Sequence, residues 1–307
     1  MVAAAVILVF TVIILYNHWI SKQLLLKNVK ENVTSQASSA VYNMEVLFRS
    51  SMEPAEGLAE IITEFELDID MIKTIQRIML ENNQPLFGTC VAFEPYNYDD
   101  TSLYQASYFY KSGDTIKYEN LGTKEYNYFL WDWYQIPKEL KTSIWSDPYY
   151  DEGGGNIIMS TYSVPVMKGD SVTGIVTIDI SLDWLEQVMS ELRFFESGYA
   201  FLLSRNGTII THPRKEYIMN ESIFSLAEEM NIPQLREIGR LMIEGNSSFT
   251  VYRSVLTEKE SLLFFLPIPS TGWSLAIVIP QDELYADLYR LNRDLAIIGI
   301  IGVILLI

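Results

Sequence analysis

Hydrophobic side chains recur at intervals of three and four residues from residue 17 to residue 65, and this spacing predicts one long helix. Pro54 lies inside this segment and is expected to kink the helix or to start a second one. A short helix is expected at residues 69–81. Beyond it the pattern changes to short apolar runs separated by polar turns, which indicates strands.

Two successive units follow from this second pattern. The first has strands, a short helical or irregular aromatic segment at 127–140, and a closing helix; its strands are expected at 86–93, 104–110, 115–119, 156–166 and 171–181, and the helix at 182–192. The second begins near residue 196 with two strands around an Asn-Gly turn. Its strands are expected at 199–204, 208–211, 247–252, 260–266 and 273–279, and its helices at 223–230, 233–244 and 281–293.

Both ends of the chain are apolar, at residues 1–16 and 295–307, and only Thr11 interrupts the first. Each run is shorter than the ~20 residues that cross a bilayer as a helix. Tyr16 and Trp19 suit a membrane interface, and no small-residue cleavage site follows. We therefore expect an uncleaved membrane helix at 1–20 and the start of a second one at 295–307, with a domain between them that returns to the same bilayer.

Charge and composition exclude several functions. The net charge of −17 opposes a nucleic-acid partner, because phosphates would be repelled. Cys90 is the only cysteine and lies in an apolar run, so it is expected to be a buried strand thiol. His18 and His212 have no neighbours at metal-ligand spacing, and no serine stands in a nucleophile motif. We expect no metal, no cofactor and no catalytic residues.

Four motifs in order resemble those of double Cache sensor domains. Residues 198–202 (GYAFL) and 206–213 (NGTIITHP) resemble the G-Y-x-F-L and G-x4-H-P pattern of Cache domains. Residues 174–182 (GIVTIDISL), followed by Asp183-Trp184-Leu185, resemble the end of the membrane-distal module. Residues 271–275 (TGWSL) resemble the last strand of the proximal module.

The resemblance implies an α+β fold in which a long N-terminal helix carries two tandem PAS-like antiparallel-sheet Cache modules, flanked by two transmembrane helices. The implied division is a stalk helix at 21–68, a ligand-binding distal module at 69–195, a proximal module at 196–280 and an exit helix at 281–294. It also implies an extracytoplasmic sensor of a homodimeric receptor in the bacterial inner membrane. The output, outside this chain, would be a phosphatase, a histidine kinase or a chemotaxis transducer.

One branch of the family binds amino acids through the motif Y-x4-R-x-W-Y and a later Asp. Four positions match, namely Tyr126, Trp133, Tyr134 and Asp179. Trp131 stands where the family has Arg, and an indole cannot form a bidentate pair with a carboxylate.

Aromatic rings and acids without a nearby Arg or Lys suit an amine or a quaternary ammonium ion. On an alternating strand, Asp179 shares a face with Thr177 and lies opposite Val176 and Ile178. Asp151, in the glycine turn of residues 151–156, and Tyr162 complete the candidate ligand contacts.

Other interpretations remain open at this point. Trp131 is equally compatible with a packed core, whereas the motif match favours ligand contact for Trp133 and Tyr134. An amino-acid or small-carboxylate sensor would have the same fold. A membrane-anchored hydrolase would need the acids at 147–152 and Asp179, but it lacks a nucleophile–base pair. A module that binds no small ligand is a third possibility. Tyr199 and His212 would line a second pocket or serve the core.

Overall fold

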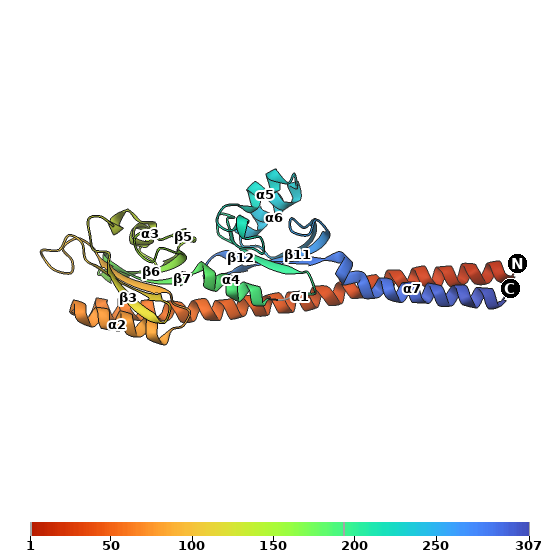
Figure 1. Cartoon of the computed structure of the whole chain (residues 1–307), viewed down its shortest axis with the longest axis horizontal. Helices are drawn as coiled ribbons and strands as arrows, with labels where there is room; N and C mark the ends of the chain where they lie inside the picture. Colours follow the sequence, from red (N-terminus) through yellow and green to blue (C-terminus); the bar gives the residue numbers. More distant parts are fainter. Residues whose placement is uncertain (1, 193, 307) are drawn as a thin grey trace.

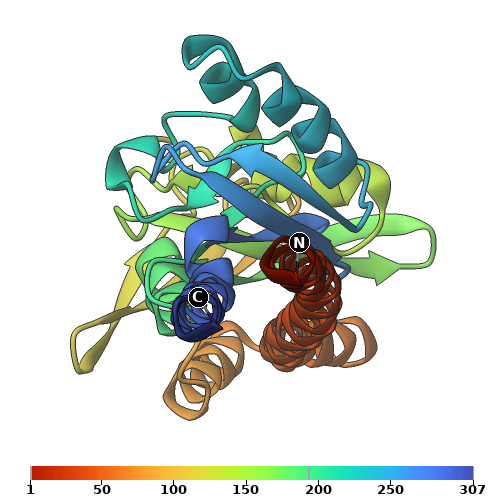
Figure 2. The ribbon, with the colours of Figure 1, turned by 90° about the vertical axis from the view of Figure 1, so that its right-hand side faces the viewer.

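The computed structural model of the chain describes residues 2–192 and 194–306. One helix, α1 (Val2–Glu64), runs along the whole molecule, and two antiparallel sheets lie one after the other on its side (Figure 1). The last helix, α7 (Gln281–Leu306), lies beside the first part of α1, so the start of α1 and the end of α7 lie at the same end of the molecule (Figures 1 and 2). The α+β architecture expected from the sequence is confirmed.

Helix α1 is continuous through Pro54, so no second helix starts there. Its buried positions follow the helical period and present one stripe to both sheets: Val33, Ala37, Met44, Phe48, Ala55, Leu58 and Ala59. Among the described residues, no helix is both long and apolar enough to span a bilayer. Residues 1 and 307, at the ends of the two expected membrane segments, lie outside the described residues.

The first sheet has the order β3-β2-β1-β7-β6-β4, with β5 also paired to β6. Its strands are β1 (Gly88–Phe93), β2 (Ala106–Ser112), β3 (Thr115–Asn120), β4 (Ile144–Trp145), β5 (Tyr149–Tyr150), β6 (Ile158–Lys168) and β7 (Ser171–Ser181). The two-residue strands β4 and β5 were not expected from the sequence, because they are too short to show an alternating pattern.

Opposite faces of this sheet have different neighbours. One face packs on α1 and on α2 (Ile69–Asn82), and it carries Val91, Val164, Val176 and Ile178. The other face is covered by the 3₁₀ helix η1 (Tyr128–Leu130) and by α3 (Asp132–Leu140), which form a separate aromatic cluster over Cys90, Ala92 and Ile175. Because side chains alternate along a strand, the sheet separates an apolar face from an aromatic and polar one.

Helix α4 (Leu182–Glu191) connects the two sheets and starts directly after β7. The Ser181 hydroxyl caps it by accepting a hydrogen bond from the backbone N–H of Trp184 at 3.2 Å. The second sheet then has the order β10-β11-β12-β8-β9. Its strands are β8 (Tyr199–Leu203), β9 (Ile209–Thr211), β10 (Ser248–Arg253), β11 (Glu260–Ile268) and β12 (Trp273–Pro280).

The second sheet is also covered on both faces. Its α1-facing side carries Leu202 and Ile277, while α5 (Ile223–Glu229) and α6 (Pro233–Ile243) cover the side that carries Phe201 and Val278. A short 3₁₀ helix, η2 (Lys215–Tyr217), follows β9.

Phe48 of α1 joins the two sheets. Its ring lies edge-on to Trp145 of the first sheet at 5.4 Å and to Trp273 of the second at 5.6 Å, and all three side chains are buried. A polar contact lies nearby, because Arg205 donates a hydrogen bond to the Trp145 carbonyl at 2.8 Å. The turn between β8 and β9 therefore bridges to the first sheet.

Replacing Phe48 with Ala is expected to destabilise the fold by about 3–5 kcal/mol, because a buried aromatic side chain is lost and both tryptophans lose a ring contact. Chemical denaturation followed by tryptophan fluorescence measures this change. Tyr42→Ala on the same helix is the matched control, because Tyr42 is 69% exposed, and it should cost under about 0.5 kcal/mol. Equal effects of the two substitutions would contradict a joining role for Phe48.

Candidate functional site

The candidate site lies on the face of the first sheet that points away from α1. Asp179 on β7 is at its centre, and its neighbours on the adjacent strands are Gly88 of β1 and Thr161 of β6. The expected orientation of Asp179, on the side of Thr177 and opposite Val176 and Ile178, is confirmed. Asp179, Thr161 and Thr177 line a cavity together with Cys90, Tyr108, Leu121, Tyr126, Trp133, Tyr149, Asp151 and Met159.

Asp179 is buried, with 1% of its surface exposed. The Thr161 hydroxyl donates to its Oδ1 at 2.7 Å, and Tyr149 lies 2.8 Å from the same hydroxyl. Because Thr161 has one proton and gives it to Asp179, Tyr149 is the donor in that second contact. Among the described residues, Oδ2 has no hydrogen-bond partner.

Burial raises the pKa of Asp179 to about 7, and the nearby Asp151 carboxylate adds to the rise. The hydrogen bond from Thr161 opposes it. The Tyr108 hydroxyl also lies close to Oδ2 and lowers the pKa, but it does not have the geometry of a hydrogen bond to that oxygen. Asp179 is thus a half-titrated acid near neutral pH.

Asp151 is the second buried carboxylate of the site. It accepts hydrogen bonds from the Tyr126 hydroxyl at 2.9 Å and from the Gly155 backbone N–H at 2.7 Å. Burial nevertheless raises its pKa. The glycine turn packs against it so closely that a Cβ at Gly154 would overlap Asp151 Oδ2. Glycine is therefore required there by contact, and the turn borders the cavity.

The aromatic residues of the motif are divided between two places. Tyr126 and Trp133 line the cavity. Trp131 stacks on Tyr126 at 5.4 Å, is only partly buried and forms an outer layer. Tyr134 is turned away from the cavity, since its hydroxyl donates to Glu94 at 2.6 Å and Lys138 pairs with the same carboxylate at 2.9 Å.

Tyr162 does not reach the cavity. It lies on the opposite face of β6, where its hydroxyl donates to Glu56 of α1 at 2.6 Å and its ring packs on Trp145. The physical reason is strand alternation, which sends Thr161 to the cavity and Tyr162 to α1. Of the seven candidate ligand contacts, the structure brings together Tyr126, Trp133, Asp151 and Asp179.

Several cavity residues were not identified from the sequence, among them Tyr108, Tyr149 and Thr161. Thr161 carried a usable signal, because it alternates with Tyr162 and Val164. Tyr108 and Tyr149 did not, because their place depends on the register between strands, where Cys90 faces Tyr108 and Met159 faces Tyr149. The cavity itself is small, about 10 Å³, which is room for about one water molecule.

Two family models match this chain. One is the methyl-accepting chemotaxis protein-like, first PDC sensor domain, at residues 72–187, and the other is the Cache 3/Cache 2 fusion domain, at residues 156–294. Together they span both sheets. The chain belongs to the Cache family of sensor domains.

Curated and solved relatives agree with this assignment. The methyl-accepting chemotaxis protein PscA of Pseudomonas syringae pv. tomato is 24% identical, and the match covers 100% of this chain and 45% of PscA. The extracellular domain of the putative histidine kinase mmHK1S-Z3 is 26% identical with a TM-score of 0.76, covering 86% of this chain and 98% of that one. The Cache chain thus spans less than half the length of PscA.

A third relative shows the same fold with a ligand bound. The ligand-binding domain of the amino acid chemoreceptor PctB of Pseudomonas aeruginosa PAO1, in complex with L-Arg, is 18% identical with a TM-score of 0.60, covering 85% of this chain and 98% of that one. The two solved relatives are thus the extracellular domain of a putative histidine kinase and the ligand-binding domain of an amino acid chemoreceptor.

Asp179 makes the stability of the ligand-free Cache chain depend on pH. Its pKa is about 7 in the folded state and 3.8 as a reference carboxyl, so between these values the folded state binds the extra proton. This contribution is fully present below pH 3.8 and is lost as pH rises through 7, by up to about 4 kcal/mol.

Asp179→Asn should therefore flatten the fall in stability between pH 4 and pH 8 and raise the stability at pH 8. Urea denaturation at a series of pH values measures it. Asp100→Asn in an exposed turn is the matched control and should leave the pH dependence unchanged. An unchanged slope in Asp179→Asn would contradict the raised pKa.

Proposed function

We propose that this Cache chain is the extracytoplasmic sensor of a transmembrane receptor and that its distal cavity binds a small amine or quaternary ammonium ion. One observation carries the proposal: two buried carboxylates, Asp151 and Asp179, line the cavity, while none of its described lining residues is Lys, Arg or His. Buried carboxylates without a cation are costly. A ligand that brings a positive charge offsets that cost.

The unpartnered Oδ2 of Asp179 gives the cation a specific place. An ammonium N–H would complete the hydrogen bonding of this oxygen, with Thr161 holding Oδ1. The rings of Tyr108, Tyr126, Trp133 and Tyr149 surround the same space. Their faces attract cations, and the attraction is stronger in a desolvated site.

Entry of any ligand requires the cavity wall to move, because about 10 Å³ holds no organic molecule. The most accessible part of the wall is the glycine turn together with Tyr126 and Trp131, which are partly exposed. Gly153 has a φ of +85° and lies against the Tyr126 ring. We propose that this segment opens for the ligand and closes over it.

An amino-acid or small-carboxylate ligand is the alternative within the same fold, and the amino acid bound to PctB is its precedent. Trp131 disfavours it. A ligand carboxylate would need a cation, and Trp131 occupies the motif position of the family's Arg without offering one. The small cavity also favours a module that binds no small ligand, so an absence of any binding would support that function.

We further propose the membrane arrangement implied by the apolar ends. Residues 1–20 would cross the bacterial inner membrane and residues 295–307 would start a second crossing. The distal module at 69–195 and the proximal module at 196–280 would lie outside the cytoplasm. Support comes from α1 and α7, which lie side by side at one end of the molecule. Ligand would shift α7 against α1 in a homodimer and thereby control a chemotaxis transducer, histidine kinase or phosphatase domain.

Purified domain is expected to melt at a higher temperature with choline, ethanolamine or putrescine than with matched sodium salts. Ligand at about 100 times its Kd adds about 2.7 kcal/mol, which is a shift of a few degrees. Asp179→Asn should abolish the shift. Tyr162→Phe on the opposite face is the matched control and should keep it. Shifts only with carboxylates would contradict the amine ligand, and no shift at all would favour the module without a ligand.

Binding of an amine should weaken as pH falls. The amine needs ionised Asp179, and the pKa of that group is about 7 in the free protein. Below this value each pH unit should therefore weaken binding about tenfold, while above it the affinity levels off. Isothermal titration calorimetry from pH 5 to pH 8.5 measures the profile. An affinity that stays constant across this range would show that the Asp179 carboxylate does not pair with the ammonium group of the ligand.

A further inference from the structure

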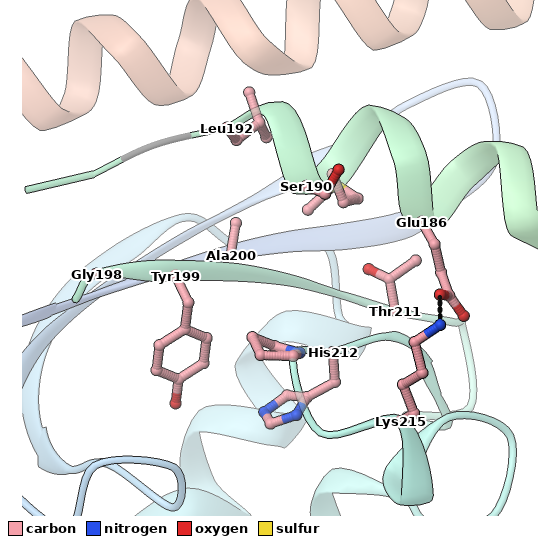
Figure 3. A pocket seen from close by; sticks show the side chains of 11 residues that line it. Glu186, Ser190, Leu192, Gly198, Tyr199, Ala200, Thr211, His212 and Lys215 are labelled. Atoms are coloured by element: carbon pink, nitrogen blue, oxygen red, sulfur yellow. Dashed lines mark ion pairs between the residues drawn. The ribbon is translucent and has the colours of Figure 1, made fainter. Parts of the chain in front are cut away.

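A second cavity lies in the proximal half of the molecule, beneath helix α4 and at the β9 edge of the second sheet (Figure 3). Its volume is about 310 Å³, which reaches the range of small-molecule sites and far exceeds that of the distal cavity. It is bounded by α4, by the start of β8 and by the segment from Thr211 to Lys215.

Two hydrogen-bond donors in the wall of this cavity, on His212 and Thr211, are unused in the described part of the chain. His212 is 7% exposed, and its Nδ1 accepts a hydrogen bond from the Arg214 backbone N–H at 3.0 Å. The proton of the neutral ring is therefore on Nε2. Among the described residues, none accepts a hydrogen bond from this Nε2–H.

Thr211 adds a second donor. It is 2% exposed, and its Oγ1 accepts from the Leu202 backbone N–H at 3.2 Å, while its own proton has no acceptor in the described part of the chain. The ring of His212 remains neutral near pH 7, because burial lowers its pKa to about 4. It is thus a fixed donor across the physiological range.

One carboxylate, Glu186, also lines the cavity, but it is already paired. Lys215 Nζ lies 3.3 Å from Glu186 Oε2, and Figure 3 shows the two side chains facing each other at one end of the cavity. The Lys215 side chain is 83% exposed, and its ammonium has further N–H donors for another group. The apolar side chains of the wall include Met189, Leu192 and Ala200, and Ser190 and Tyr199 also line it.

We propose that this cavity is a second ligand site and that it binds a small monocarboxylate. The carboxylate oxygens accept from His212 Nε2–H and Thr211 Oγ1–H, and Lys215 supplies the opposite charge. The short apolar part of the ligand packs on Met189, Leu192 and Ala200. The two cavities thus differ in chemistry, since the distal one offers acids to a cation and this one offers donors to an anion.

A ligand in this cavity would contact a helix that lies between the two sheets along the chain. Helix α4 forms one wall and continues directly from β7, the strand that carries Asp179. A ligand between α4 and β8 therefore touches the helix that follows the first sheet and leads to the second. Occupation of the site is expected to fix the position of this connection.

Propionate is the probe, and the ¹⁵N signals of the two histidines report its place. The His212 Nε2 resonance should move with a saturable dependence on propionate at constant ionic strength, whereas that of His18, in α1, should not. His212→Phe keeps an aromatic ring beside Tyr199 and removes the donor, so calorimetry should show binding at least tenfold weaker. Ser190→Trp, at an exposed position of α4, should block the cavity.

Asp179→Asn separates the two cavities, because it should leave propionate binding unchanged. No saturable shift of His212 up to about 100 mM propionate would overturn the proposal. The same follows if binding survives Ser190→Trp or disappears in Asp179→Asn, because the ligand would then occupy the distal cavity. If His212→Phe fails to fold, the wild-type signals and Ser190→Trp still decide.

Discussion

The fold depends on the burial of two sheets against one helix. Each sheet has an apolar face, and α1 provides the stripe that covers both of them in a single continuous core. Phe48 is where these contacts meet, because its ring touches Trp145 of the first sheet and Trp273 of the second. Neither sheet can move along the helix without breaking a contact that the other shares. The spacing of the two cavities is fixed by the same helix.

This arrangement places the candidate site on the face of the first sheet that points away from α1. In the first sheet, Val176 and Ile178 hold β7 on α1, while Asp179 and Thr177 point to the aromatic side. The cost of burying Asp151 and Asp179 is met by apolar contacts on the other side of the same strands. Strand alternation thus separates the residues that hold the sheet on α1 from the residues of the candidate site. A residue substituted on one face has little direct contact with residues on the other face.

Strand alternation also decides how far the sequence predicted the site. Alternation along β7 alone placed Asp179 on the correct face. The same rule was not applied to β6, where it would have predicted that Tyr162 faces α1 and Thr161 faces the cavity. Tyr108 and Tyr149 were beyond this rule, since they reach the cavity through pairing registers between distant strands. The hydrophobic period predicted helix α1. Its continuity through Pro54 was not predicted, because local helix propensity takes no account of the packing of α1 against the two sheets.

The closed distal cavity of this sensor domain has an electrostatic cost, because two carboxylates are buried there without a cation. Two carboxylates and an unpartnered oxygen are held in a space too small for an organic molecule, so the ligand-free form keeps a half-protonated acid near neutral pH. In the proposed function, a bound cation would offset the charge of these carboxylates and so favour the occupied form. Strand β7 continues into α4, and α4 leads to the second sheet, which contacts α7. A change in the distal cavity could therefore pass along the chain and through packed side chains to the end of the molecule where α1 and α7 meet.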